Sequence, residues 1–96
     1  VILKNMALQP VKGDKMNKIT VYSTMTCPYC VMLTRWLDEK DIEYTEFKVD
    51  QHPVAAQNMV RISGQMGVPF TTIEKADGNV EKVVGFDPRR IEAALA

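Results

Sequence analysis

Metal-ligating side chains are scarce in this sequence. Its 96 residues include two cysteines, Cys27 and Cys30, and a single histidine, His52. A structural zinc site takes four such ligands, and His52 lies a whole predicted helix and strand beyond the cysteines. We therefore predict no metal site within one chain, and zinc shared between two chains is the arrangement that the sequence leaves open.

An excess of charge of one sign is also absent. Twelve lysines and arginines balance twelve aspartates and glutamates, which gives a formal net charge of zero. Without a net positive field, binding to nucleic acid or to an anionic membrane surface is not expected. No apolar run approaches the roughly 20 residues that a membrane-spanning helix needs. We expect neither nucleic acid nor membrane among the partners.

An export signal is missing as well. Val1-Ile2-Leu3 is too short for the apolar region of a signal peptide, and no small-residue cleavage pattern follows it. We therefore expect a cytoplasmic location, where thiols are kept reduced and a close cysteine pair is more often catalytic or metal-binding than structural. Residues 1–15 are interpreted as an N-terminal leader or loosely attached arm, and residues 16–96 as one domain, because a second core would not fit.

Strand-like and helix-like patterns alternate along the chain. β-Branched or alternating residues predict four strands, over 19–22, 43–49, 70–73 and 80–84. Apolar residues at helical spacing predict three helices, which begin at Cys27, Pro53 and Pro88. Strands joined through a helix should be parallel, and Asp77-Gly78 favours a tight hairpin between the last two. The predicted fold class is α/β, in the order β-α-β-α-β-β-α, with a four-stranded mixed sheet flanked by three helices.

The two cysteines stand where the first strand gives way to the first helix, in Cys27-Pro28-Tyr29-Cys30. A helix N-terminus stabilises a thiolate, which is the form that attacks disulfides. Cys27 is therefore predicted to be the nucleophile and Cys30, one turn further, the resolving thiol. Tyr29 is placed to flank a bound substrate. A structural disulfide, which would close a very short loop, is the other interpretation of the pair.

A second signal is Val68-Pro69 at the entry to the third predicted strand. Proline removes a ladder hydrogen bond there. One interpretation is a loop proline that starts the strand. The other is a cis peptide that turns the Val68 backbone toward the cysteines, so that its N–H and C=O groups pair with a bound peptide like an added strand.

Three segments together resemble the glutaredoxins, within the thioredoxin-like superfamily, and the likeness extends over Lys18 to Leu95. They are Cys27-Pro28-Tyr29-Cys30, Gly64-Gln65-Met66-Gly67-Val68-Pro69 and Gly85-Phe86-Asp87. The resemblance implies a thioredoxin-like fold over residues 16–96, a cis-proline at Pro69, no tightly bound cofactor, and glutathione as co-substrate.

The same resemblance implies where glutathione binds. Its cysteine backbone would pair with Val68, and its γ-glutamyl end would meet Phe86 and Asp87. Asp87 is also predicted from its position before Pro88 to cap the last helix. Many glutaredoxins carry a lysine three residues before the first cysteine, and here that place is taken by Thr24.

We predict a monomeric thiol–disulfide oxidoreductase that reduces protein disulfides or glutathione mixed disulfides. The Gly85-Phe86-Asp87-Pro88 ending is similar to that of the glutaredoxin-like electron donors of ribonucleotide reductase, so the electron donor is either glutathione or a thioredoxin reductase. A non-enzymatic alternative is a homodimer that holds an iron–sulfur cluster through Cys27 of each chain and two glutathiones.

Overall fold

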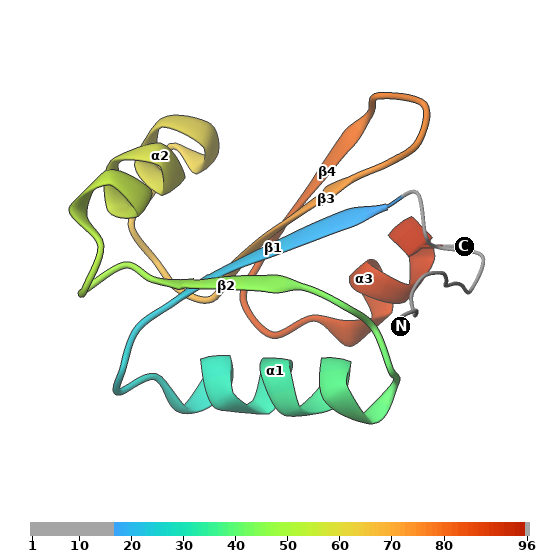
Figure 1. Cartoon of the computed structure of the whole chain (residues 1–96), viewed down its shortest axis with the longest axis horizontal. Helices are drawn as coiled ribbons and strands as arrows, with labels where there is room; N and C mark the ends of the chain where they lie inside the picture. The colour runs from blue at the N-terminus through green and yellow to red at the C-terminus, as the bar shows by residue number, and fades with distance from the viewer. Residues whose placement is uncertain (1–16, 96) are drawn as a thin grey trace, which may run out of the picture.

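The order of helices and strands is the predicted one. The computed structural model describes residues 17–95 (Figure 1), so the expected leader at residues 1–15 lies outside the described residues. The elements are β1 (Lys18–Ser23), α1 (Pro28–Glu39), β2 (Thr45–Lys48), α2 (Pro53–Ser63), β3 (Phe70–Glu74), β4 (Val80–Val84) and α3 (Pro88–Leu95). None of the described helices is long and apolar enough to cross a membrane.

The four strands form one mixed sheet in the order β2-β1-β3-β4. β1 is parallel to β2 and antiparallel to β3, and β3 and β4 form an antiparallel hairpin, as predicted. Because of this topology, β1, β2 and β4 end, and β3 begins, at the same end of the sheet. We call this end of the sheet the thiol edge, as distinct from the edge strands; it is made by residues 24–27, 49–52, 64–69 and 85–87.

The helices cover both faces of the sheet (Figure 1). α1 and α3 pack on one face, over a core formed by Ile19, Val21, Leu33, Leu37, Ile73, Val83, Ile91 and Ala94. α2 covers the other face, where its Ala55 and Met59 pack against Tyr22 and Phe70. The ring of Tyr22 stacks between Phe47 and Phe70, at 5.9 Å from each. Alternation along the strands thus supplies both cores.

Local sequence explains where the helices begin and end. Pro28 and Pro53 occupy first-turn positions, where the missing N–H costs no hydrogen bond. Gly64 ends α2 in the left-handed conformation, with φ of 72°, and its N–H donates to the Val60 carbonyl. Cys30, Leu33 and Leu37 form the buried face of α1, as their spacing predicts.

β4 lies at a free edge of the sheet. Such an edge presents unpaired backbone groups that can pair with another chain. Arg90 of α3 reaches back across it, and its Nη2 donates to the Lys82 carbonyl at 3.3 Å. One backbone acceptor of the edge strand is thereby occupied from within the molecule.

Candidate active site

Cys27 and Cys30 are joined by a disulfide at the N-terminus of α1, with their Cα atoms 5.2 Å apart. Cys27 is the N-cap residue, and its Sγ accepts a hydrogen bond from the Cys30 backbone N–H at 3.1 Å. Cys27 is 9% exposed, whereas Cys30 is 1% exposed. The first sulfur therefore lies on the outer side of the helix end and the second lies inside it.

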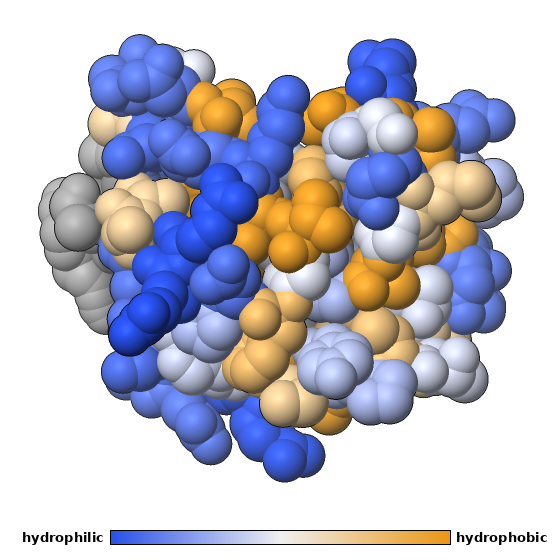
Figure 2. Space-filling view, turned by 180° about the vertical axis from the view of Figure 1, so that it is seen from behind, coloured by the Kyte–Doolittle hydropathy of each residue, from blue (hydrophilic) through white to orange (hydrophobic). Residues whose placement is uncertain are grey.

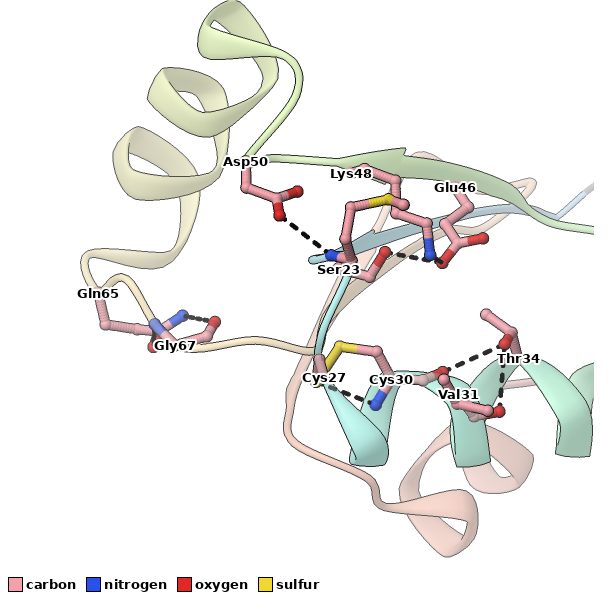
Figure 3. Close-up of a disulfide and its surroundings, with 11 residues drawn as sticks. Ser23, Cys27, Cys30, Val31, Thr34, Glu46, Lys48, Asp50, Gln65 and Gly67 are labelled. Carbon is pink, nitrogen blue, oxygen red and sulfur yellow. Dashed lines mark hydrogen bonds and ion pairs between the residues drawn. A yellow bond between two sulfur atoms is a disulfide. The ribbon is translucent and has the colours of Figure 1, made fainter.

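The loop that carries Cys27 out of β1 is fixed by the end of β2. The Val49 N–H donates to the Ser23 carbonyl at 2.8 Å. The Met25 N–H donates at 3.1 Å to Oδ2 of Asp50, which is labelled in Figure 3. Thr24, between these two anchors, is half-buried. Asp50 was not singled out by sequence, because nothing in the chain order indicates that it meets the loop before the cysteines.

The peptide bond between Val68 and Pro69 is cis, as the second interpretation of this proline expects, while the pairing of Val68 with a bound peptide stays a prediction. Pro69 is buried, and its carbonyl accepts a hydrogen bond from the Gly85 N–H at 2.8 Å. Since Phe70 pairs with Tyr22, the residues just before β3 lie beside those just after β1. The fold thus brings Val68 and Pro69 to the thiol edge with the cysteines.

Gln65 organises the segment that leads into this proline. Its side-chain nitrogen donates to the Gly67 carbonyl and to Ser63 Oγ, both at 3.2 Å (Figure 3). Ser63 Oγ in turn donates to the Met59 carbonyl, so that the turn is tied to the last turn of α2. Gln65 lies in one of the segments that resemble the glutaredoxins, but the sequence did not indicate that it positions this turn.

Phe86 and Asp87 reach the thiol edge from β4, and both are half-buried. The Asp87 carboxylate accepts the Arg90 N–H at 3.3 Å, so Asp87 caps α3 as predicted. The Phe86 side chain packs against the core under α1 and α3. What Phe86 offers at the thiol edge is therefore mainly its backbone.

Exposed apolar side chains accompany the disulfide. Viewed from behind, the surface carries hydrophobic patches between hydrophilic strips (Figure 2). Large exposed apolar side chains at or next to the thiol edge are Met25, Tyr29, Met66 and Val84. Tyr29, between the two cysteines, is 61% exposed, which is where its predicted contact with substrate requires it to be.

A polar cluster of Ser23, Glu46 and Lys48 lies between β2 and α1 (Figure 3). Ser23 Oγ donates to Glu46 Oε2 at 2.7 Å, and Lys48 Nζ lies 2.9 Å from the same oxygen. Burial by itself would raise the pKa of Glu46, but the bonds from Ser23 and Lys48 outweigh it and lower that pKa. Sequence reasoning missed this cluster.

Within residues 17–95, no three histidine, cysteine, aspartate or glutamate side chains are grouped so that they could hold a metal ion. The chemistry that the site offers is that of its two sulfur atoms. A strand that leads to a dithiol at a helix N-terminus, with a cis-proline across from it, defines a protein of thioredoxin-like fold with a redox-active cysteine pair.

Comparison with known proteins identifies the family within this class. The family model described as Glutaredoxin matches residues 19–75. The chain therefore belongs to the glutaredoxin family, as its sequence segments predict, and it is a thiol–disulfide oxidoreductase. Such proteins act on disulfides and need no tightly bound cofactor.

Individual relatives agree with this assignment. An uncharacterized glutaredoxin-like 8.6 kDa protein in the rubredoxin operon of Clostridium pasteurianum is 35% identical over 77 residues, which are 80% of this chain and 96% of that protein. The glutaredoxin-like protein NrdH of Lactococcus lactis subsp. cremoris is 32% identical over 54 residues, covering 56% of this chain and 74% of that protein. Among solved structures, the thioredoxin-like protein BC3987 superposes with a TM-score of 0.69 at 29% identity, over 81% of this chain and 100% of that chain.

Proposed function

We propose that this protein reduces disulfides with Cys27 as the nucleophile and Cys30 as the resolving thiol. The observation that carries the proposal is the difference between the two sulfurs. Cys27 caps α1 from its outer side and accepts a backbone N–H, whereas Cys30 is enclosed. A backbone N–H directed at sulfur favours the thiolate, and Cys27 is the more exposed of the two cysteines.

The reaction then runs in two displacements. The Cys27 thiolate attacks one sulfur of the substrate disulfide, that S–S bond breaks, and the other sulfur leaves as a thiolate. Cys30 loses its proton and attacks Cys27 Sγ, which releases the second substrate sulfur as a thiolate that takes up a proton. Two electrons have passed to the substrate, and the chain is left with the Cys27–Cys30 disulfide.

The rim of the thiol edge is proposed to hold the substrate or glutathione. The Val68 backbone, next to Pro69, would pair with an extended segment of it. Phe86 and Asp87 would meet its far end, and Thr24 and Tyr29 would flank it near the cysteines. Proteins that contain a disulfide are the proposed targets, the domain is taken to be residues 16–96, and the cytoplasm is its proposed location.

Cysteine variants test the assignment of roles. We expect Cys27→Ser to abolish reduction of every disulfide. Cys30→Ser should lose reduction of protein disulfides and keep activity on glutathione mixed disulfides, because the latter step needs only the outer sulfur. Turnover with both substrate types measures this, and Gln57→Ser on the exposed face of α2 is the control. Activity that survives Cys27→Ser would overturn the proposal.

A thioredoxin reductase as electron donor is the second candidate. Thr24 in place of a lysine, the Gly85-Phe86-Asp87-Pro88 ending and the similarity to NrdH favour it. The deciding measurement compares turnover driven by glutathione and its reductase with turnover driven by thioredoxin reductase. A reduction potential well below the glutaredoxin range of about −200 to −230 mV would favour the second donor.

A further inference from the structure

The cluster of Ser23, Glu46 and Lys48 has no part in the two displacements, yet it lies beside the dithiol. In the parallel ladder, Glu46 pairs with Val21 and Lys48 pairs with Ser23. Paired residues on neighbouring strands project to the same face of a sheet, and Val21 belongs to the core under α1 and α3. The cluster therefore lies on the face that α1 covers, in the surroundings of the disulfide (Figure 3).

The position of Glu46 along α1 follows from its neighbour on the strand. Tyr44 Oη donates to Asp38 Oδ1 at 3.1 Å. β2 runs toward the thiol edge, whereas α1 runs away from it. Moving two residues forward along β2, about 7 Å, therefore corresponds to moving about one turn back along α1. Counted back from Asp38, one helical turn places Glu46 at the level of Thr34, about one turn of α1 away from Cys30.

The inner member of the ion pair is the carboxylate. Ser23, which donates to Glu46 Oε2, is fully buried. The side chain of Lys48 is 35% exposed and that of Glu46 is 24% exposed. Water screens the ammonium group more than the carboxylate, and on this ground we infer that the negative charge outweighs the positive one at the dithiol.

We propose that the carboxylate of Glu46, held by Ser23 and Lys48, keeps the enclosed Cys30 in its thiol form, so that the first thiolate of the reduced protein forms at Cys27. The inference rests on the proposed roles of the two cysteines. A fixed negative charge opposes a second one nearby in a poorly solvated place. Cys30 is enclosed, whereas Cys27 has a backbone N–H to stabilise its charge.

The neighbouring charges agree with this direction. The titratable and charged groups around Glu46 are Lys48 and Tyr44 on β2 and Asp38 on α1. Tyr44 keeps its proton because burial, and then the bond to Asp38, raise its pKa to about 12. Lys48 is thus the cation of the cluster, and it is already bound to Glu46.

Charge variants test the proposal directly. In a Cys27→Ser background, the pKa of Cys30 is measured by the ultraviolet absorbance of its thiolate. We expect Glu46→Gln to lower that pKa by about one unit, Lys48→Gln to raise it, and Glu46→Asp to stay near the parent. Glu43→Gln is the matched control, because it removes the same charge from an exposed residue outside the cluster. A pKa that rises in Glu46→Gln, or that falls equally in Glu43→Gln, would overturn the proposal.

A kinetic experiment on the intact dithiol provides the second readout. The reduced protein is mixed with dithiobis(nitrobenzoate), which releases one coloured thiolate when Cys27 attacks and another when Cys30 resolves the adduct. Glu46→Gln should shift the pH midpoint of the second phase downward and leave the first phase nearly unchanged. An equal change in both phases would mean a general structural effect and would refute the role of Glu46.

The same experiment separates this inference from the one on which it rests. If Cys27→Ser retained the first phase, or if Cys30→Ser retained the second, the cysteine roles themselves would be wrong. Should Glu46→Gln fail to fold, Lys48→Gln alone still tests the proposal, since it must move the second phase in the opposite direction.

Discussion

At the scale of single residues, Thr71 presents a buried hydroxyl that is not used. Its Oγ1 is fully enclosed and has no hydrogen-bond partner within the described structure. Thr71 pairs with Val21 on one side and with Val83 on the other, and both belong to the core under α1 and α3. An enclosed hydroxyl without a partner costs about 1–3 kcal/mol in lost solvation.

Valine has nearly the shape of threonine without the hydroxyl. We therefore expect Thr71→Val to increase the free energy of unfolding by about 1 kcal/mol, measured by urea denaturation of the oxidised protein. Thr34→Val is the contrasting variant, because the Thr34 hydroxyl donates to carbonyls of α1. A Thr71→Val protein less stable than the parent would show that the hydroxyl has a partner in solution.

Some residues of the candidate site could be recognised from the sequence, and others could not. The cysteine pair of Cys27 and Cys30 could be recognised from the local chemistry of its segment, whereas local chemistry left the cis peptide before Pro69 open and the resemblance to the glutaredoxins implied it. Ser23 and Glu46 could not be, because they are 23 positions apart and meet only through the register of β1 and β2. A serine after a strand and a glutamate within one are ordinary features until that register is known.

At the scale of elements, helix starts were predicted better than strand ends. Pro53 and Pro88 are the first residues of α2 and α3, as predicted, because proline suits the first turn of a helix. β2 was predicted over 43–49 but spans Thr45–Lys48, because its ladder with β1 begins at the pair of Thr20 and Thr45. Alternation continues to Tyr44, whose side chain serves the contact with α1. An alternating pattern shows which residues of a strand face the core, whereas pairing with the neighbouring strand determines how long the strand is.

The end of α2 gives a test at this scale. Gly64 has a φ of 72°, and a Cβ added there would meet nothing within 4 Å. The cost of Gly64→Ala is therefore conformational, about 1 kcal/mol, or a loss of about 4–8 °C in Tm for a domain of this size. Gly64→Asn should lose less, because asparagine tolerates the left-handed region better. Thermal unfolding that ranks asparagine below alanine would contradict this explanation.

At the scale of the whole molecule, the topology and both cores follow from the order of patterns along the chain. A helix between two strands made them parallel, and the turn around Asp77-Gly78 made the last pair a hairpin. The central strand β1 is covered by α1 and α3 on one face and by α2 on the other, so its side chains are buried on both faces. Residues 19–23 are accordingly all buried.

Tyr44 should contribute to the loss of stability at alkaline pH. The pKa of Tyr44 is raised to about 12 by burial and by its bond to Asp38, against about 10 in an unfolded chain. Its contribution is therefore fully present below pH 10 and is lost as pH rises toward 12. We expect the stability advantage of the parent over Tyr44→Phe to shrink across this window, as followed by urea denaturation at several pH values. An advantage that stays constant would show that the raised pKa is wrong.

The sulfur of Cys27 is the proposed reactive atom and also the N-terminal cap of α1, so the redox chemistry and the folding of the dithiol share a thermodynamic cycle. The oxidised and reduced chains differ in unfolding free energy. Once converted from volts to energy, the difference in reduction potential between the folded and the unfolded dithiol must match that difference. About 1.4 kcal/mol corresponds to about 30 mV for this two-electron couple. Denaturation curves of the two forms, with the potential of an unstructured Cys-Pro-Tyr-Cys peptide as reference, therefore give the potential of the folded protein without any partner protein.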